Sequence, residues 1–270
     1  MKQLHFYKYQ GAGNDFIIVD GRTHSVELLP KEILFLCDRR FGIGADGLMV
    51  VGNAPDVDFT MRYYNADGHE GTMCGNGGRC LVAYVAQKRE NTHFTFGAID
   101  GIHHAKVIGH EGAESQICLG MKNVDTIQRY GNDGFFLNTG SPHLVFFDTD
   151  VAQLDVFDRG AFWRNHPDFA PEGVNVNFAG MDADGTLFVR TFERGVENET
   201  LACGTGVTAA AIAAYFRAGN KEGTYEYPVR TLGGTLQVSF RANGMCLDHV
   251  LLTGPATFVF EGFIDTMHDD

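Results

Sequence analysis

The chain has 270 residues and a hydrophobic content of 44%, which is enough apolar material for two cores of ordinary domain size. Its formal net charge of −13 argues against nucleic acids and anionic membrane surfaces as partners, because both require basic patches on the protein. No apolar run is long enough to span a bilayer and no signal-peptide pattern is present, so we expect a cytoplasmic protein.

The first half of the sequence predicts several strands, one short helix and one buried helix. Pro30 near a first turn and basic residues in a last turn predict a helix over residues 30–40. Apolar residues at helical spacing predict a second helix after Cys74. β-branched and aromatic residues predict strands at residues 5–9, 16–19, 57–64 and 92–96.

The second half repeats this organisation. The segment after Cys203 is apolar almost all round, so we expect a helix that other structure encloses. Short strands are expected at residues 186–192, 235–240 and 257–260. A polar stretch at residues 111–115 separates the halves. We therefore expect two domains, residues 1–114 carrying Cys74 and residues 115–270 carrying Cys203, with the last strand able to pack back on the first domain.

Matched motifs at a nearly constant offset indicate an internal duplication. Each match alone is weak, but they follow one another in chain order at an offset of 128 or 129 positions. The sequence therefore predicts two similar domains. The matched features are Gly44 with Gly173, Glu70 with Glu199, Cys74 with Cys203, and residues 16–20 with residues 144–148.

Two of the six cysteines stand directly before a Gly-x-Gly turn that opens an apolar helix, namely Cys74 and Cys203. A thiol at a helix N-terminus meets unpaired backbone N–H groups and the positive end of the helix dipole, which favour the thiolate. One such cysteine suggests a nucleophile. Two in matching positions suggest an acid and a base that act on one carbon from opposite sides. The others lack the glycine turn and are interpreted as core or incidental residues: Cys37, Cys80, Cys118 and Cys246.

Three further motifs contain residue types that carry chemistry in other proteins. Residues 42–47 fit GxGxxG, but a helix end precedes and a strand follows, the reverse of a dinucleotide site, so we reject that interpretation. His143 stands out because Gly-Ser-Pro fixes the backbone before it. Glu193 and Arg194 are either a surface ion pair, or a carboxylate near a thiol with a guanidinium for a substrate carboxylate.

Taken together, these motifs resemble the diaminopimelate epimerase family over essentially the whole chain. The resemblance implies an α+β fold of two pseudo-symmetric domains, each a mostly antiparallel, β-barrel-like sheet around a central helix, with the active site between them. It also implies a homodimer, no cofactor and no metal. The motifs that carry it are Gly11-Ala-Gly-Asn-Asp-Phe16, Gly42-Ile-Gly-Ala-Asp46, Asn65-Ala-Asp-Gly68, Cys74-Gly-Asn-Gly77, Gly173-Val-Asn-Val176, Glu193-Arg-Gly195, Ala202-Cys-Gly-Thr-Gly206 and Leu252-Thr-Gly-Pro-Ala256.

The implied reaction converts LL-diaminopimelate to the meso form on the route to lysine and the cell wall. By resemblance, Cys74 and Cys203 exchange the α-proton as thiolate and thiol, while His143 and Glu193 tune the thiols or hold the α-amino group. Backbone N–H groups at the two helix starts would clamp the α-carboxylate. These are at Gly75, Asn76, Gly204 and Thr205, and the residues expected to read the substrate are Asn14, Asn65, Asn175 and Arg194.

Two positions depart from the commoner family pattern. Gly47 replaces a glutamine, so that substrate contact is lost or replaced. Ser141 replaces an asparagine and keeps a shorter hydrogen-bonding group at the substrate site. Fine specificity depends on these changes, whereas the two-thiol chemistry does not.

Three alternatives to this function remain at the level of sequence. A proline or hydroxyproline racemase also uses paired cysteines, but its substrates lack the distal ammonium and carboxylate that Asn65, Asn175 and Arg194 are expected to read. A cysteine hydrolase would use Cys203 as sole nucleophile and His143 as base. A binding module without catalysis is disfavoured, because two activated thiols are prone to oxidation.

Overall fold

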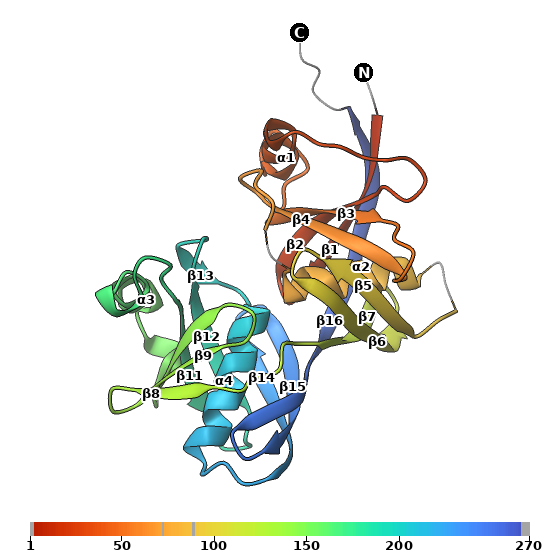
Figure 1. The fold of residues 1–270 in the computed structure, drawn as a ribbon. Helices are drawn as coiled ribbons and strands as arrows, with labels where there is room; N and C mark the ends of the chain where they lie inside the picture. Colours follow the sequence, from red (N-terminus) through yellow and green to blue (C-terminus); the bar gives the residue numbers. More distant parts are fainter. Residues whose placement is uncertain (1–2, 72, 88–89, 266–270) are drawn as a thin grey trace. The chain divides into compact units, whose positions relative to one another are not determined.

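Two units make up the fold, and the computed structural model describes residues 3–71, 73–87 and 90–265 (Figure 1). The first unit comprises Met1–Leu119 and Gly254–Asp270, and the second comprises Gly120–Thr253. From the sequence we expected the boundary between the two domains to lie between residues 114 and 115. The long strand β16 (Cys246–Asp265) serves both units, because its beginning pairs with β15 of the second unit and the remainder pairs with β7 and β1 of the first.

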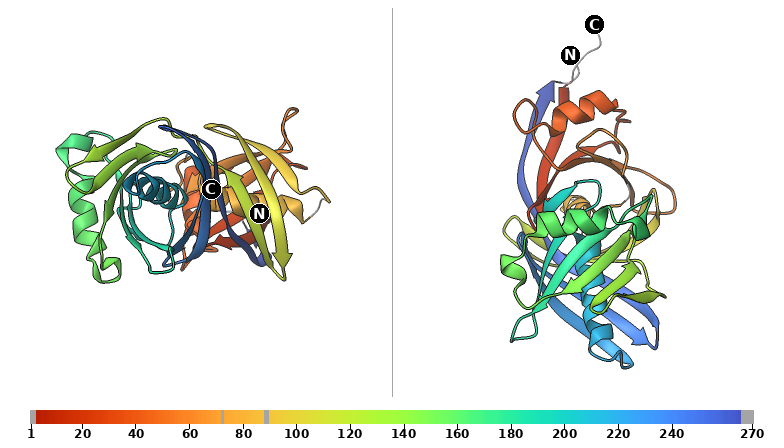
Figure 2. Two further views of the ribbon diagram at one scale, coloured as in Figure 1. Left: turned by 90° about the horizontal axis from the view of Figure 1, so that it is seen from below. Right: turned by 90° about the vertical axis from the view of Figure 1, so that its left-hand side faces the viewer.

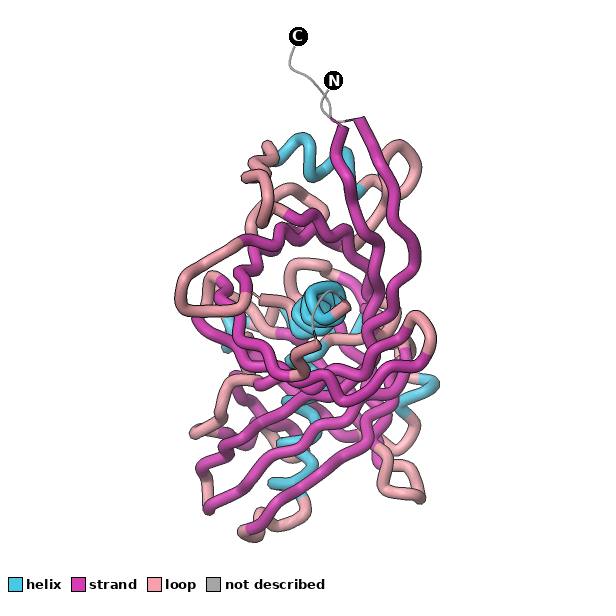
Figure 3. Tube along the Cα trace, turned by 90° about the vertical axis from the view of Figure 1, so that its right-hand side faces the viewer, coloured by secondary structure: helices cyan, strands magenta, loops and turns pink. Residues whose placement is uncertain are grey.

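The first unit is a ring of strands around helix α2 (Gly75–Ala86). β1 to β7 pair consecutively and β16 pairs with both β7 and β1, so the ring closes. All twelve residues of α2 are buried, and Figure 3 shows this helix end on within the strands. The strands are β1 (Gln3–Gly11), β2 (Asn14–Asp20), β3 (Gly47–Gly52), β4 (Phe59–Asn65), β5 (His93–Ala98), β6 (Gly101–Glu111) and β7 (Glu114–Gly120).

A second helix, α1 (Pro30–Cys37), covers the outer face of this ring. Its Ile33 and Leu36 pack in one buried cluster with Ile17 and Val19 of β2. The neighbouring Phe16 points to the other face, towards α2, since a Cβ on Gly77 of α2 would lie 3.5 Å from its ring. Both faces of β2 are therefore covered, which explains why this strand is a continuous apolar run.

The second unit has the same plan around helix α4 (Gly204–Arg217). Its strands run in the order β8, β9, β10, β11, β12, β14, β15 and β16, and residues 206–215 of α4 are all buried. Figure 2 shows α4 end on inside these strands. The elements are β8 (Ile127–Tyr130), β9 (Gly134–Asn138), β10 (Pro142–Phe147), β11 (Asn175–Met181), β12 (Leu187–Glu193), β13 (Asn198–Thr200), β14 (Gly223–Thr231), β15 (Gly234–Asn243), α3 (Val156–Arg164) and the 3₁₀ turns Val151–Gln153 and Pro167–Phe169.

The pairing pattern supports the duplication that the sequence predicts. In the first unit the parallel pairs are β2 with β3 and β4 with β5, and in the second they are β10 with β11 and β12 with β14. Parallel neighbours require a crossover connection, and here each crossover contains a helix: α1, α2, α3 and α4 in turn. All other pairs are antiparallel, so the expected α+β fold of two barrel-like sheets around central helices is confirmed.

Most predicted elements are confirmed, and the differences have local or long-range causes. The helix expected over residues 30–40 ends at Cys37, because the Asp38 carboxylate accepts hydrogen bonds from the backbone N–H groups of Arg40 and Phe41 and starts a turn. The strand expected at residues 257–260 is part of the much longer β16. Helix α3 was not predicted. Within the described ranges, no helix is both long and apolar enough to cross a bilayer.

Candidate active site

Cys74 and Cys203 occupy the same position in their respective units, the N-cap of the central helix. Both have extended backbone, and their carbonyl groups accept the first helical hydrogen bonds, from Gly78 N at 2.7 Å and Val207 N at 2.9 Å. The first N–H groups of each helix, which follow the cysteine directly, have no intrahelical partner. Within the described ranges neither cysteine is part of a disulfide; Cys74 is half-buried and Cys203 is 7% exposed. Both cysteines therefore lie at the starts of helices, as the Gly-x-Gly turns predicted.

In the first unit, the amide of Asn14 lies at the centre of the contacts around Cys74. The Cys74 thiol donates to Asn14 Oδ1 at 3.7 Å, and Asn76 Nδ2 donates to the same oxygen at 3.3 Å. Asn14 Nδ2 in turn donates to Asp46 Oδ2 at 2.6 Å, which fixes the orientation of its amide. Its oxygen therefore faces Cys74 as an acceptor, an arrangement that stabilises the protonated thiol.

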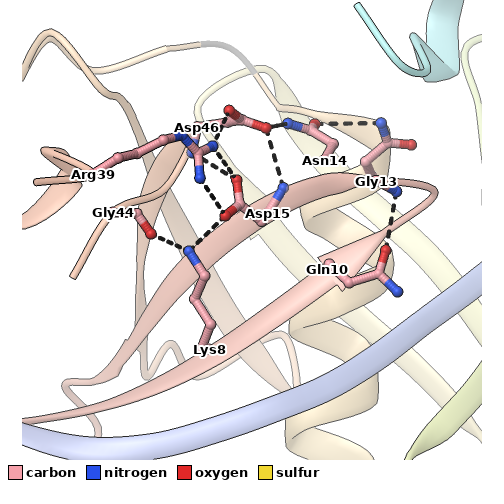
Figure 4. A network of polar contacts seen from close by, with 9 residues as sticks. Lys8, Gln10, Gly13, Asn14, Asp15, Arg39, Gly44 and Asp46 are labelled. Atoms are coloured by element: carbon pink, nitrogen blue, oxygen red, sulfur yellow. Dashed lines mark hydrogen bonds and ion pairs between the residues drawn. The ribbon is translucent and has the colours of Figure 1, made fainter. Parts of the chain in front are cut away.

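A charged network holds Asn14 in place (Figure 4). Lys8 and Arg39 both pair with Asp15, at 2.7 and 2.6 Å, and Arg39 also pairs with Asp46 at 2.7 Å. Burial alone would raise the pKa of Asp15, but the hydrogen bonds from Arg39 and Lys8 outweigh it and hold the pKa well below its usual range. Two cations and two carboxylates balance here, so the network positions Asn14 without adding net charge.

Tyr63 fills the space beside Gly47. A Cβ on Gly47 would lie 2.6 Å from Tyr63 Cε2 and 2.9 Å from its hydroxyl oxygen, and a Cβ on Gly71 would lie 3.0 Å from the same ring. The ring thus lies between two glycines, with Phe16 edge-on to it at 6.2 Å. Asn65 opposes Gly47 in the β3–β4 register. A Cβ at position 47 would also lie 2.7 Å from the backbone oxygen of Tyr64, so a side chain there requires both the Tyr63 ring and the β4 backbone to shift.

In the second unit, His143 is fully buried on β10 and is held as a neutral imidazole. Burial, followed by the nearby Arg194, lowers the pKa of His143 to about 3. Asn177 Oδ1 accepts from Thr191 Oγ1 at 2.9 Å, so the Asn177 amide nitrogen faces His143 Nδ1 at 3.1 Å. Nδ1 is therefore an acceptor, and Nε2 carries the proton.

A row of hydroxyl groups links His143 to Cys203. Ser141 Oγ lies 3.0 Å from His143 Nε2, and it also accepts from Asn175 Nδ2 at 3.2 Å. With two donors aimed at its oxygen, Ser141 donates its own proton to Thr205 Oγ1 at 3.3 Å. Thr205 Oγ1 lies 3.5 Å from Cys203 Sγ and is left to donate to it. This direction of donation stabilises Cys203 as a thiolate, the opposite of the arrangement at Cys74.

The remaining predicted residues of the second unit lie next to this row. The Asn175 amide ties strands together, because its Nδ2 also donates to Pro142 O at 3.0 Å and its Oδ1 accepts from Arg194 N at 2.9 Å. Arg194 Nη1 donates to Glu172 O at 3.3 Å. Glu193 Oε2 accepts from Thr200 Oγ1 at 2.9 Å and is half-buried at the end of β12.

The predicted site residues form two groups, one in each unit. Within each unit, the contacts described above link several of these residues to the cysteine at the N-terminus of the central helix. Sequence reasoning missed the residues that orient these groups, although Asn177 has a signal, since it is two positions after Asn175 on the same face of β11. The first group is Asn14, Gly47, Asn65, Cys74, Gly75 and Asn76; the second is Ser141, His143, Asn175, Glu193, Arg194, Cys203, Gly204 and Thr205; the missed residues are Asp46, Tyr63, Arg79, Asn177 and Thr191.

Neither the larger surface pocket nor a metal-binding cluster offers a second candidate site among the described residues. A surface pocket of about 670 Å³ in the second unit is lined by residues that include Asp148, Arg217 and Arg230, but by none of the predicted site residues. In the part of the chain that the structure describes, no three His, Cys, Asp or Glu side chains gather closely enough to hold a metal ion. The chemistry-bearing residues therefore remain those at the two helix N-termini.

Known proteins resemble this chain both in sequence and in fold. The diaminopimelate epimerase of Flavobacterium psychrophilum is 46% identical over 265 residues, covering 96% of this chain and 99% of that protein, and the diaminopimelate epimerase of Chlorobaculum tepidum is 41% identical over 257 residues, covering 94% and 98%. Among solved structures, a PhzF-family phenazine biosynthesis protein of Bacillus anthracis matches with a TM-score of 0.75 at 17% identity (98% and 99% coverage), and a hydroxyproline epimerase from Agrobacterium vitis with 0.70 at 14% (99% and 93%); these share the fold. Because a sequence model named diaminopimelate epimerase also matches residues 6–121 and 135–259, the chain belongs to the diaminopimelate epimerase family.

Proposed function

We propose that this protein is a cofactor-independent isomerase that converts LL-2,6-diaminopimelate to meso-diaminopimelate, in the biosynthesis of lysine and peptidoglycan precursors. Membership of the family supports the substrate and the reaction. The observation that carries the mechanism is the contrast between the two helix N-caps. Cys74 donates to Asn14, whereas Thr205 is placed to donate to Cys203. One thiol and one thiolate are the pair that inversion at a carbon requires.

The reaction is a two-proton exchange. The Cys203 thiolate takes the α-proton, the C–H electron pair stays on the α-carbon, and the Cys74 thiol donates its proton to the opposite face. After one turnover Cys203 is a thiol and Cys74 a thiolate, and the reverse reaction uses them in exchanged roles. The proposal includes that both sulfurs approach the same carbon when substrate is bound. It also includes that water is excluded there, because the α-proton is a very weak acid.

Fixed dipoles supply the stabilisation that the carbanion needs. We assign the α-carboxylate to the first N–H groups of α2 and α4, at Gly75, Asn76, Gly204 and Thr205, because each lies at the positive end of a helix dipole. His143 acts as a neutral donor that orients Ser141, rather than as a base. For the rest of the substrate, Glu193 is assigned to the α-amino group, and Asn65 and Arg194 to the distal amino-acid end.

The proposal is tested by α-proton exchange in D₂O with purified reduced protein and no added cofactor. We expect deuterium in LL-diaminopimelate and none in proline. Cys74→Ala and Cys203→Ala should each abolish epimerisation, whereas Cys246→Ala, at an exposed thiol on β16, should retain it as the matched control. Exchange of proline instead would favour the racemase alternative.

The same experiment separates the other classes of function. A cysteine hydrolase predicts that Cys74→Ala stays active and that an acyl-enzyme accumulates. It also requires an imidazole bonded to the nucleophile, but the hydrogen bonds of the His143 ring go to Ser141 and Asn177. A binding module predicts no exchange with any amino acid.

Assembly and location complete the proposal. We infer a homodimer from the family resemblance, and a cytoplasmic enzyme from that resemblance together with the formal net charge of −13. Light scattering coupled to size-exclusion chromatography should give twice the mass of the 29.6 kDa chain. Elution at the mass of one chain would refute the dimer without affecting the chemistry.

A further inference from the structure

Arg79 is a fully buried cation on α2, five positions after Cys74. Its Nη2 donates to Asn76 Oδ1 at 2.9 Å, and its Nε donates to Pro255 O at 3.4 Å. Nη1 has no hydrogen-bond partner, and none of the described carboxylates forms an ion pair with the guanidinium. A charged group so buried and so incompletely paired needs an explanation.

Stability does not supply that explanation. Removing a charge from water is costly unless a counter-ion and full hydrogen bonding compensate, and burial indeed lowers the pKa of Arg79. The position within α2 adds to the cost, because a cation near a helix N-terminus meets the positive end of the dipole. An apolar side chain of similar volume would suit the folded state better. The residue is therefore matched to an anion that is present only part of the time.

The surrounding charges leave Arg79 as the unbalanced cation near Cys74. From β1, β2 and the loop before β3, the groups that face Asn14 are Lys8, Arg39, Asp15 and Asp46, which neutralise one another. On α2 itself, burial raises the pKa of the Cys80 thiol to about 12, so that thiol stays neutral. The guanidinium interacts electrostatically with Cys80 first and with Cys74 second. Because the Cys80 thiol stays neutral, Cys74 is the partner of these two that gains a negative charge when it gives up its proton.

We propose that Arg79 is a positioning residue for Cys74. Its Nη2 fixes the Asn76 amide, whose nitrogen then faces Asn14 Oδ1, and its buried charge supports the thiolate that Cys74 becomes in each turnover. The inference rests on the proposed function, since it assigns Cys74 both protonation states. Asn14 stabilises the thiol and Arg79 the thiolate, so that neither form is trapped.

The second unit contains a natural control. The position that matches Arg79, 129 residues later, is Thr208, which is also fully buried but neutral. Thr208 Oγ1 donates to Gly204 O at 2.9 Å within α4. Cys203 therefore has no cation at the matching position, and its reactivity should not depend on Arg79.

The test is the pH dependence of alkylation of the two thiols in the full-length reduced protein, without substrate. Iodoacetamide modification of the Cys74 and Cys203 peptides is followed by mass spectrometry in wild type, Arg79→Gln, Arg79→Met and Arg79→Lys. We expect the Gln and Met variants to lose roughly tenfold in Cys74 reactivity at neutral pH, corresponding to a shift of about one pH unit in the midpoint. Cys203 should keep its profile, and the Lys variant should keep most of the Cys74 reactivity.

Thermal unfolding of the same variants distinguishes this role from a structural one. Because the Gln and Met variants remove an uncompensated buried charge, they should be at least as stable as wild type. An unchanged Cys74 profile in folded Arg79→Gln would overturn the proposal. The proposal would also be overturned by equal shifts in the alkylation pH profiles of Cys74 and Cys203, or by unfolding of both Arg79→Gln and Arg79→Met. A third contrary result would be Cys74 alkylation as slow in Arg79→Lys as in Arg79→Gln. Because alkylation is measured without diaminopimelate, it tests the role of Arg79 independently of whether the protein exchanges the α-proton of that substrate.

Discussion

Replacing Gly206 by alanine tests the packing that holds the second catalytic group together. Gly206 is in the first turn of α4, and a Cβ there would overlap Asn177 Oδ1 and lie 3.2 Å from Thr191 Oγ1. These two atoms are hydrogen-bonded to each other at 2.9 Å, and the Asn177 amide also holds His143. The Asn177 amide is thus held by hydrogen bonds at its oxygen and at its nitrogen, so it cannot rotate away from an added methyl group as a flexible side chain would.

The expected change in the free energy of unfolding of Gly206→Ala is the sum of opposing contributions. Alanine gains about 0.5–1 kcal/mol over glycine in a helix. Overpacking costs about 1–3 kcal/mol, and a strained or broken buried hydrogen bond costs about 1 kcal/mol more. The net destabilisation by Gly206→Ala is therefore about 1–3 kcal/mol, or roughly 2–4 °C in Tm for each kcal/mol. Cys203 alkylation should also slow, since Asn177 and His143 are displaced.

Gly78→Ala on α2 is the matched control. A Cβ on Gly78 would lie 3.4 Å from Leu119 Cδ2 and 3.5 Å from Phe96 Cζ, which are ordinary contacts. This variant gains the helix propensity without the overlap and should be stabilised by about 0.5–1 kcal/mol. Both variants are compared by thermal unfolding followed by circular dichroism. If Gly206→Ala proves as stable as Gly78→Ala, the reasoning about the Asn177 contact is wrong.

Three further predictions concern both units. Burial lowers the pKa of His143 to about 3, so as the pH falls the unfolded chain protonates this imidazole before the folded chain does. The stabilisation present above about pH 6.5 is therefore lost as the pH falls. In urea unfolding, the free energy of unfolding of wild type should decrease by about 2 kcal/mol more than that of His143→Gln between pH 7 and pH 5. Ser141→Ala interrupts the hydroxyl row and should slow Cys203 alkylation about fivefold without changing Cys74, whereas equal rates would show that the row does not tune the thiol. Gly47→Ala should cost about 1–3 kcal/mol in wild type and a smaller amount in a Tyr63→Ala background, where the added Cβ still lies 2.7 Å from the backbone oxygen of Tyr64; additive changes in a double-mutant cycle would contradict the overlap with the Tyr63 ring.

Local sequence determined much of this protein. Glycine turns after Cys74 and Cys203, followed by apolar residues at helical spacing, predicted two helices with thiols at their N-termini. The almost wholly apolar composition of the second helix predicted that other structure encloses it, because it has no polar face suited to water. The constant offset between matched motifs predicted the duplicated topology. The end of α1 at Cys37 was misjudged, since the Asp38 turn competes with one more helical turn at little difference in energy.

Tertiary structure alone decided which polar side chains meet. Asn14 and Asp46 come from separate strands and loops, as do His143 and Asn177, and local patterns carry no information on such long-range pairs. The burial of Arg79 is the extreme case, because its residue type predicts an exposed position and only the closed ring of strands makes it a core residue. Residue type and spacing thus set the elements and the reactive thiols, while the environment that sets the protonation of each thiol arises when distant segments pack together.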